Sequence, residues 1–131
     1  MRNQAREAAL NVIFSEQFNE DSSDSFKKKI YKQFGLTKED DLLFAADLIA
    51  TVQEHRKELI EKIESVSHHY LENRIQPMDK SILLIAMAEI CYFDDIPPVV
   101  SVSEAVGLAR KYSTEQSVDF VNGVLAGIIN Q

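Results

Sequence analysis

The side chains in this sequence that could do chemistry form no catalytic arrangement. His68 and His69 are neighbours, so on a helix they point about 100° apart and cannot chelate one ion as residues four apart can. Cys91 has no second cysteine to pair with, and neither a phosphate-binding glycine loop nor a nucleophile elbow is present. The acidic runs 39–41 and 94–95 belong to a helix start and a loop, where carboxylates meet the helix dipole or face water. We therefore expect no catalytic residue, metal site or cofactor.

Two aromatic residues stand apart from the apolar faces of their expected helices. In the first helix the core stripe is centred on Ala5, Ala9 and Val12, which places Phe14 far around the cylinder. In the last helix Phe120 points away from the stripe, which consists of Val118, Val121, Leu125 and Ile128. Such rings either pack between groups of helices or are exposed for a ligand. Asn122 lies near the stripe, so we expect a buried, hydrogen-bonded amide there.

The charge balance limits how this chain could bind nucleic acid. A net charge of −7 and a pI near 4.9 oppose indiscriminate binding, which depends on Lys and Arg neutralising phosphates. Positive charge is nevertheless clustered, at Arg2 with Arg6, at Lys27 to Lys29 with Lys32, and at Arg110 with Lys111. Each cluster is either a solvated face or a local binding patch.

The elements that would position these residues are helices, because apolar residues recur at three- and four-residue spacing and strand-like alternation is nearly absent. We expect helices at 3–18, 24–34, 38–70 (as two helices or one bent helix), 80–93, 101–112 and from 113 onward. Gly35 should end the second helix, and Thr37 should cap the third. Ser101 with Glu104, and Ser113 with Gln116, have the spacing of capping boxes. The run 82–88 is apolar all round, which predicts a central buried helix with Cys91 as a small core residue.

Length and composition predict a single domain, residues 1–131. A chain of 131 residues with 45% hydrophobic composition can bury one core, or two small cores that share a helix. No apolar run approaches the roughly 20 residues that span a bilayer. We expect a cytoplasmic protein from a reducing compartment.

Several segments together resemble the NusB family. The strongest match is 118–125 (VDFVNGVL), preceded by 96–106 and 108–112. Residues 79–83 with Ala86 and Glu89 are similar to the family's central helix, and 5–10 followed by Phe14 to its first helix. Ser103 stands where the family more usually has Asn, and Leu84 where it commonly has Arg. The stretch 19–75 is similar only in its helical layout.

The resemblance implies an all-α fold of about seven helices in two packed sub-bundles, and a factor for transcription antitermination. Such a factor binds the single-stranded boxA element of ribosomal RNA transcripts together with NusE, a small-subunit ribosomal protein, in an antitermination complex with RNA polymerase. The resemblance also implies RNA contacts at Arg2, Asn3, Gln4, Arg6, Phe14, Gln116 and Phe120, and a NusE contact at Asp79. Asn3 and Gln4 occupy positions where relatives often have Arg, which would weaken phosphate binding.

Two other functions fit the same pattern. A NusB-like domain also forms the N-terminal part of a ribosomal RNA cytosine methyltransferase. Because Gln131 follows the last expected helix directly, we expect no catalytic domain, unless this chain is the detached N-terminal domain of such an enzyme. A helical adaptor that binds only protein would suit the acidic charge and the few arginines at the start. Binding of RNA with and without the ribosomal partner separates these readings.

Overall fold

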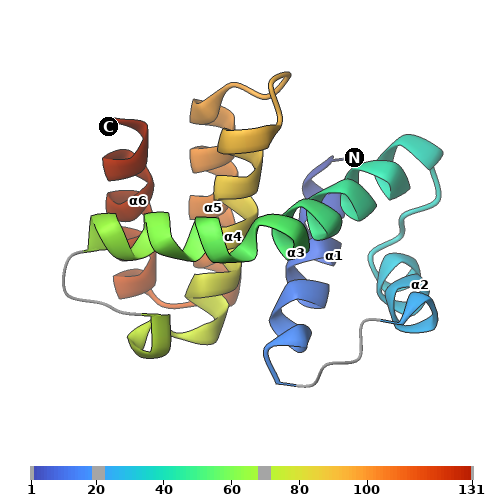
Figure 1. Ribbon diagram of the computed structural model, residues 1–131. Coiled ribbons are helices and arrows are strands. Elements are labelled where there is room, and N and C mark those ends of the chain that lie inside the picture. Colours follow the sequence, from blue (N-terminus) through green and yellow to red (C-terminus); the bar gives the residue numbers. More distant parts are fainter. Residues whose placement is uncertain (1, 19–22, 68–71, 131) are drawn as a thin grey trace. The chain divides into compact units, whose positions relative to one another are not determined.

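The computed structural model describes residues 2–18, 23–67 and 72–130, and within them the secondary structure is entirely helical, as expected. The elements, in chain order, are α1 (Arg2–Glu16), α2 (Asp24–Gln33), α3 (Glu39–Ser67), the 3-10 helix η1 (Glu72–Arg74), α4 (Pro77–Tyr92), α5 (Pro98–Tyr112) and α6 (Glu115–Ile129) (Figure 1). None of these helices has a stretch both long and apolar enough to cross a membrane. The expected ranges are confirmed to within about two residues, except that α4 and α5 begin earlier, at Pro77 and Pro98 instead of residues 80 and 101. The end expected at residue 70 for the third helix lies outside the described residues.

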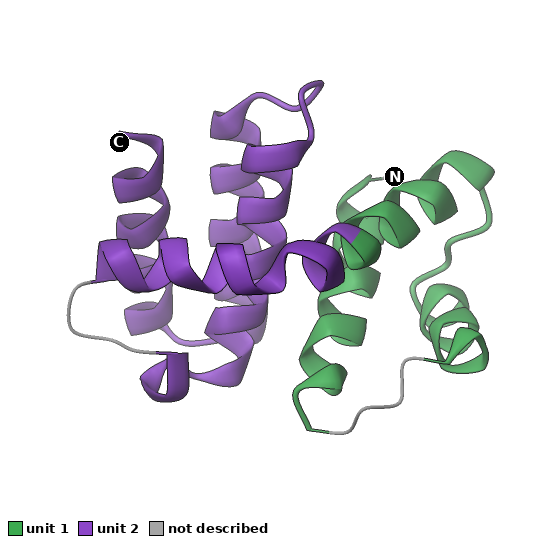
Figure 2. Ribbon diagram, in the orientation of Figure 1, with its two compact units in different colours: residues 1–50 green, residues 51–131 purple. Residues whose placement is uncertain are grey.

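The chain divides into two compact units, residues 1–50 and 51–131 (Figure 2). The first unit holds α1, α2 and the beginning of α3. Ser23 caps α2 by accepting a hydrogen bond from the Phe26 backbone N–H at 3.2 Å. Gly35 follows the helix with φ 71°, a left-handed conformation that suits glycine and ends α2 where expected. The buried apolar side chains of the first unit include Ala5, Ala9, Leu10, Val12, Ile13, Leu36, Phe44, Ala45, Leu48 and Ile49.

The second unit is built around α4, which packs against both α5 and α6. Every residue of α4 from Ile82 to Ala88 is at most 2% exposed, which confirms α4 as the central buried helix. The later part of α3 also contacts this group. Tyr92 of α4 donates a hydrogen bond to Glu58 at 2.9 Å, and Val66 lies against Gly127 of α6.

The stretch 38–70 was expected as two helices or one bent helix, and α3 is one helix from Glu39 to Ser67. The polar run 54–57 contains no glycine or proline, so it exposes polar side chains without breaking the backbone ladder. Lys38, rather than Thr37, immediately precedes α3, and its carbonyl accepts a hydrogen bond from the Leu42 N–H. His68 and His69 lie outside the described residues.

Both expected capping boxes are wrong. Helix α5 begins at Pro98, because proline has the required φ and needs no N–H partner in the first turn. Ser101 is therefore inside the helix, and its hydroxyl donates to the buried carboxylate of Glu89 at 3.0 Å. In α6 the cap is Thr114, whose Oγ1 accepts from the Ser117 N–H at 3.1 Å.

Two expectations about burial are also wrong. Cys91 is only half-buried, since it lies at the end of α4, where the Lys62 Nζ approaches its Sγ to 3.7 Å. Asn122 is exposed, because the buried side of α6 consists of Ser117, Val121, Val124 and Leu125. Of the expected stripe, Val121 and Leu125 are buried, whereas Val118 and Ile128 are only half-buried.

Candidate functional site

The first turn of α1 presents polar side chains to solvent. Arg2, Asn3 and Gln4 are all exposed, and this turn contains no acidic residue. The side-chain oxygen Oδ1 of Asn3 accepts a hydrogen bond from the Gln4 backbone N–H at 3.0 Å. A helix start carries partial positive charge from its unpaired N–H groups, and Arg2 adds a full charge to it. This end of α1 is suited to attract an anionic group.

Arg6 differs from its neighbours because it is only 4% exposed. Its guanidinium carbon lies 5.2 Å from the centre of the Phe44 ring, and that of Arg2 lies 4.5 Å from the same ring. Cations attract the negative face of an aromatic ring at such distances. Of the two arginines, Arg2 is therefore the one with surface to offer a ligand, while Arg6 packs inside its unit.

Phe14 is half-buried near the end of α1. Its ring meets that of Phe18 edge to face, with centres 5.0 Å apart and planes at 64°. Phe18 is 64% exposed, so this pair of rings places aromatic surface on the outside of the first unit. The sequence analysis did not single out Phe18, although its spacing of four from Phe14 places it on the same side of a helix.

Asp79 is buried in the second unit, with 5% of its surface exposed. Ser113 donates a hydrogen bond to its Oδ1 and Ser117 donates to its Oδ2, each at 2.8 Å. These bonds connect the first turn of α4 to the residues at the start of α6. We call this group, Asp79 with Ser113 and Ser117, the Asp79 latch.

A pocket of about 210 Å³ opens beside the Asp79 latch. It is lined by residues of η1 and the start of α4, and by the first turns of α6; they include Arg74, Ile75, Gln76, Asp79, Gln116 and Phe120. Three residues singled out in the sequence, namely Asp79, Gln116 and Phe120, therefore line a single pocket. Gln116 is exposed at the pocket and Phe120 is half-buried.

Arg74 and Gln76 were missed in the sequence, and both are exposed. The sequence does contain a signal that could have identified them, because a basic residue and an amide lie within three residues before Pro77, which opens α4. A helix start there places these residues next to Asp79. Spacing alone could not show that the start of α6 closes the other side of the pocket.

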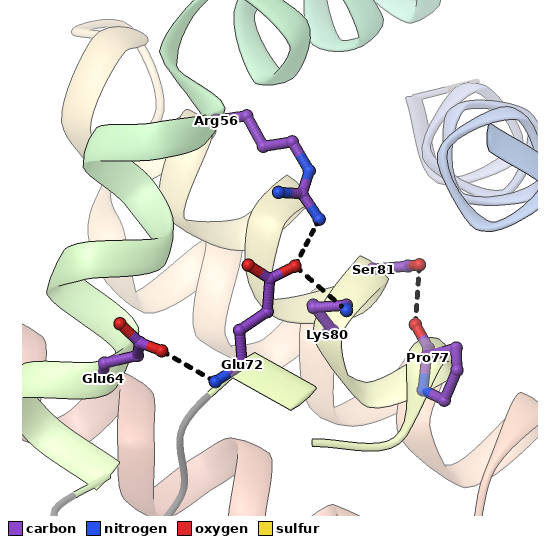
Figure 3. Close-up of polar contacts among 6 residues, drawn as sticks. All are labelled: Arg56, Glu64, Glu72, Pro77, Lys80 and Ser81. Carbon is purple, nitrogen blue, oxygen red and sulfur yellow. Dashed lines mark hydrogen bonds and ion pairs between the residues drawn. The ribbon is translucent and has the colours of Figure 1, made fainter. Parts of the chain in front are cut away.

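The segment that carries Arg74 and Gln76 is held by a group of ion pairs (Figure 3). Glu72 Oε2 lies 2.7 Å from the Arg56 guanidinium and 3.2 Å from the Lys80 Nζ. The Glu72 N–H donates to Glu64 of α3 at 2.7 Å. The hydrogen bond from Arg56 is the main cause that lowers the pKa of Glu72 below its ordinary 4.5, against the opposing effect of burial. We call this group, Arg56, Glu64, Glu72 and Lys80, the Glu72 clasp.

The sequence matches the NusB family over nearly its whole length, since the family model covers residues 3–130. The transcription antitermination protein NusB of Natranaerobius thermophilus is 34% identical over 135 residues, covering 99% of this chain and 95% of that protein. The protein of the same name from Oceanobacillus iheyensis is 37% identical over 128 residues, covering 98% of each.

Solved structures share the fold. The T. maritima NusB structure has 26% identity and a TM-score of 0.87, covering 100% of this chain and 92% of that one. A chain in the crystal structure of antitermination factors NusB and NusE in complex with double-stranded RNA has 25% identity and a TM-score of 0.88. That match covers 98% of this chain and 96% of the other.

Proposed function

The chain belongs to the NusB family, and from this premise we propose that it is a transcription antitermination factor that binds RNA together with NusE. The observation that carries the proposal is the match of the family model to residues 3–130. A likeness covering 98% of the chain to a structure that holds NusB, NusE and RNA supports the same two partners. The proposal is for a binding protein of the bacterial cytoplasm that works in the antitermination complex with RNA polymerase and catalyses no reaction.

The RNA proposed is a single strand of boxA type. Single-stranded RNA is commonly held by aromatic side chains that stack on unpaired bases, beside positive charge that meets the phosphates. In the second unit Phe120 and Gln116 line one pocket. In the first unit Phe14 is half-buried, and Arg2, Asn3 and Gln4 are exposed. Arg6 is only 4% exposed, so we assign it to the RNA site as a residue that packs beside Phe44 and supports this end of α1.

The NusE contact is proposed at Asp79. Its carboxylate is 5% exposed and accepts two hydroxyl groups, so a partner would meet it at the edge of the pocket. Asp79→Asn keeps the shape and removes the charge. If charge guides the encounter, the variant should bind NusE with a slower association rate and a weaker salt dependence. Unchanged association kinetics in a variant that folds normally would remove Asp79 from the interface.

The experiment that tests the function is RNA binding with and without NusE. A boxA-type single strand, a scrambled strand of equal length and a duplex of the boxA sequence are titrated with the purified protein, alone and with NusE. We expect the tightest binding for the boxA strand with NusE present. Equal affinity for all three RNAs, or no binding of RNA in either condition, would contradict the proposal. Binding of NusE alone would favour a protein-only adaptor.

The aromatic residues are tested by Phe14→Ala and Phe120→Ala. Loss of a ring that stacks on a base costs about 1–3 kcal/mol of RNA binding and leaves the salt dependence nearly unchanged. Circular dichroism and thermal unfolding must show that each variant folds, since both rings are half-buried. If both variants fold and bind the boxA strand with NusE as tightly as the parent, the rings serve packing alone.

A further inference from the structure

We propose that the pocket between the start of α4 and the start of α6 takes one unstacked RNA base, with Gln76 as a reading residue and Arg74 holding the neighbouring phosphate. This inference rests on the proposed RNA binding and deepens it. It assigns two residues of the segment before α4, neither of which the sequence pattern indicated.

The size of the pocket suits a single small planar group. Its volume is about 210 Å³. Pockets for drug-sized ligands begin at about 300 Å³. A whole nucleotide with its sugar and phosphate would project out of the pocket, which leaves the base inside and the backbone at the rim.

The walls have the chemistry that a base requires. Phe120 offers an aromatic ring for stacking, and Ile75 adds an apolar surface that is 5% exposed. Gln76 and Gln116 each carry an amide, which supplies donors and an acceptor for the edge of a base. Both amides are on exposed residues, so they are accessible to a ligand. Stacking with edge hydrogen bonds is how single-stranded RNA is read.

Charge at the pocket also fits RNA. Asp79 is the acidic residue among those that line it, and two serine hydroxyls already occupy its oxygens. These hydrogen bonds hold the carboxylate in place and satisfy its oxygens, so that Arg74 has to offset its negative charge toward a phosphate. Arg74 is an exposed residue among those that line the pocket, and its guanidinium carries a full positive charge. The pocket therefore offers a fixed positive charge where the RNA backbone would pass.

The Glu72 clasp gives the segment a fixed position (Figure 3). Glu72 is two residues before Arg74, and it is bound through its side chain to Arg56 and Lys80 and through its N–H to Glu64. These bonds tie η1 to α3 and α4 at once. A wall fixed before RNA arrives loses less conformational entropy on binding than a free loop would. Glu72 is thus a positioning residue for Arg74 and Gln76.

The decisive experiment is a cycle between the RNA and the protein. Each base of the bound boxA strand is removed in turn to leave an abasic site, and affinity is measured with NusE present. We expect one position at which the loss weakens binding to the parent by roughly 5- to 150-fold, the range for a stacked base. In Phe120→Ala the same abasic site should cost less than about 2-fold, because the base has already lost its stacking partner. In Gln76→Ala the abasic site should cost less than in the parent, because one contact to the edge of the base is already gone.

Arg74→Gln tests the phosphate. It should weaken binding to every strand alike and reduce the slope of log affinity against log salt by roughly 0.7. Arg110→Gln is the matched control, since Arg110 is an exposed arginine of the same unit that does not line this pocket. Asn73→Ala is the control for Gln76→Ala, because Asn73 is an exposed amide of η1 and also lies outside the lining.

The outcomes separate this inference from the function. If the parent fails to bind RNA with NusE, the proposed function falls and the pocket with it. If the parent binds but no abasic position couples to Phe120 or Gln76, the base pocket is overturned while the function stands. If only Arg74→Gln differs from its control, the pocket binds a phosphate alone and the assignment of a base is wrong.

Discussion

Asp79 shows how one residue can serve packing and a binding site together. Its two oxygens accept hydroxyls from Ser113 and Ser117, which lie more than thirty positions later in the chain. The Asp79 latch fixes the turn from which α6 starts, and therefore the positions of Gln116 and Phe120 in the pocket. A buried carboxylate is tolerated here because it is paired with donors.

Removal of the carboxylate should destabilise the fold. In Asp79→Ala the buried Ser117 hydroxyl loses its carboxylate acceptor, and Ser113 keeps only its hydrogen bond to the Ser117 oxygen. We expect a cost of about 1–3 kcal/mol. The free energy of unfolding, measured by urea denaturation, should fall by that amount. Adding Ser113→Ala should cost less than it does in the parent, because the two residues share one bond. Full additivity of the two changes would show that the latch contributes no coupling.

At the scale of elements, α6 uses its two glycines for different purposes. A Cβ at Gly127 would collide with Cγ1 of Val66 on α3, whereas a Cβ at Gly123 would meet no atom within 4 Å. Valine on a helix is nearly fixed in one rotamer, so Val66 cannot easily turn away. Gly127 therefore allows the close approach of α3 and α6.

Alanine at these two positions should have opposite effects. Gly123→Ala gains helix propensity in open space and should stabilise by about 0.5–1 kcal/mol. Gly127→Ala gains the same propensity but overpacks against Val66 at a cost of about 1–3 kcal/mol, giving a net loss of about 1 kcal/mol. Thermal unfolding of both variants beside the parent measures the difference. Equal stabilisation by both would mean that the helices separate freely.

The Glu72 clasp joins three elements and should make stability depend on pH. The folded state lowers the pKa of Glu72, chiefly through the Arg56 hydrogen bond, so the clasp stabilises above the ordinary value of 4.5. That stabilisation is lost as pH falls from 4.5 through the lower folded-state pKa. The parent should exceed Glu72→Gln in stability at about pH 7, and the two should converge once the pH has fallen through the lowered folded-state pKa of Glu72. A constant difference over this range would rule out the ionised clasp.

For the whole molecule, the net charge of −7 means that RNA affinity must come from a few local contacts. The slope of log affinity against log salt should therefore be shallow. Arg2→Ala should flatten it by roughly 0.7 if this exposed arginine meets one phosphate. Lys28→Ala is a control that removes one exposed charge from α2. Equal changes of slope in both variants would indicate a diffuse positive field instead of a local contact.

The sequence by itself determined the helical class, the central place of α4 and the family. Helical periodicity and an unbroken apolar run are local properties, so they can be read without knowing what packs against what. The N-terminal caps of α5 and α6 were predicted wrongly, because Pro98 starts α5 before Ser101 and Thr114 takes the place expected for Ser113. Their geometry depends on backbone angles that spacing does not fix.

Tertiary structure alone decided which of these side chains meet. Asp79, Gln116 and Phe120 line one pocket because α4 and α6 pack in the same unit, and that contact joins residues far apart in the chain. The burial of Arg6 against Phe44 likewise follows from the packing of α1 with the start of α3, not from the charge of arginine. Burial and partnership are sums over neighbours distant in sequence, and a helical period carries no information about them.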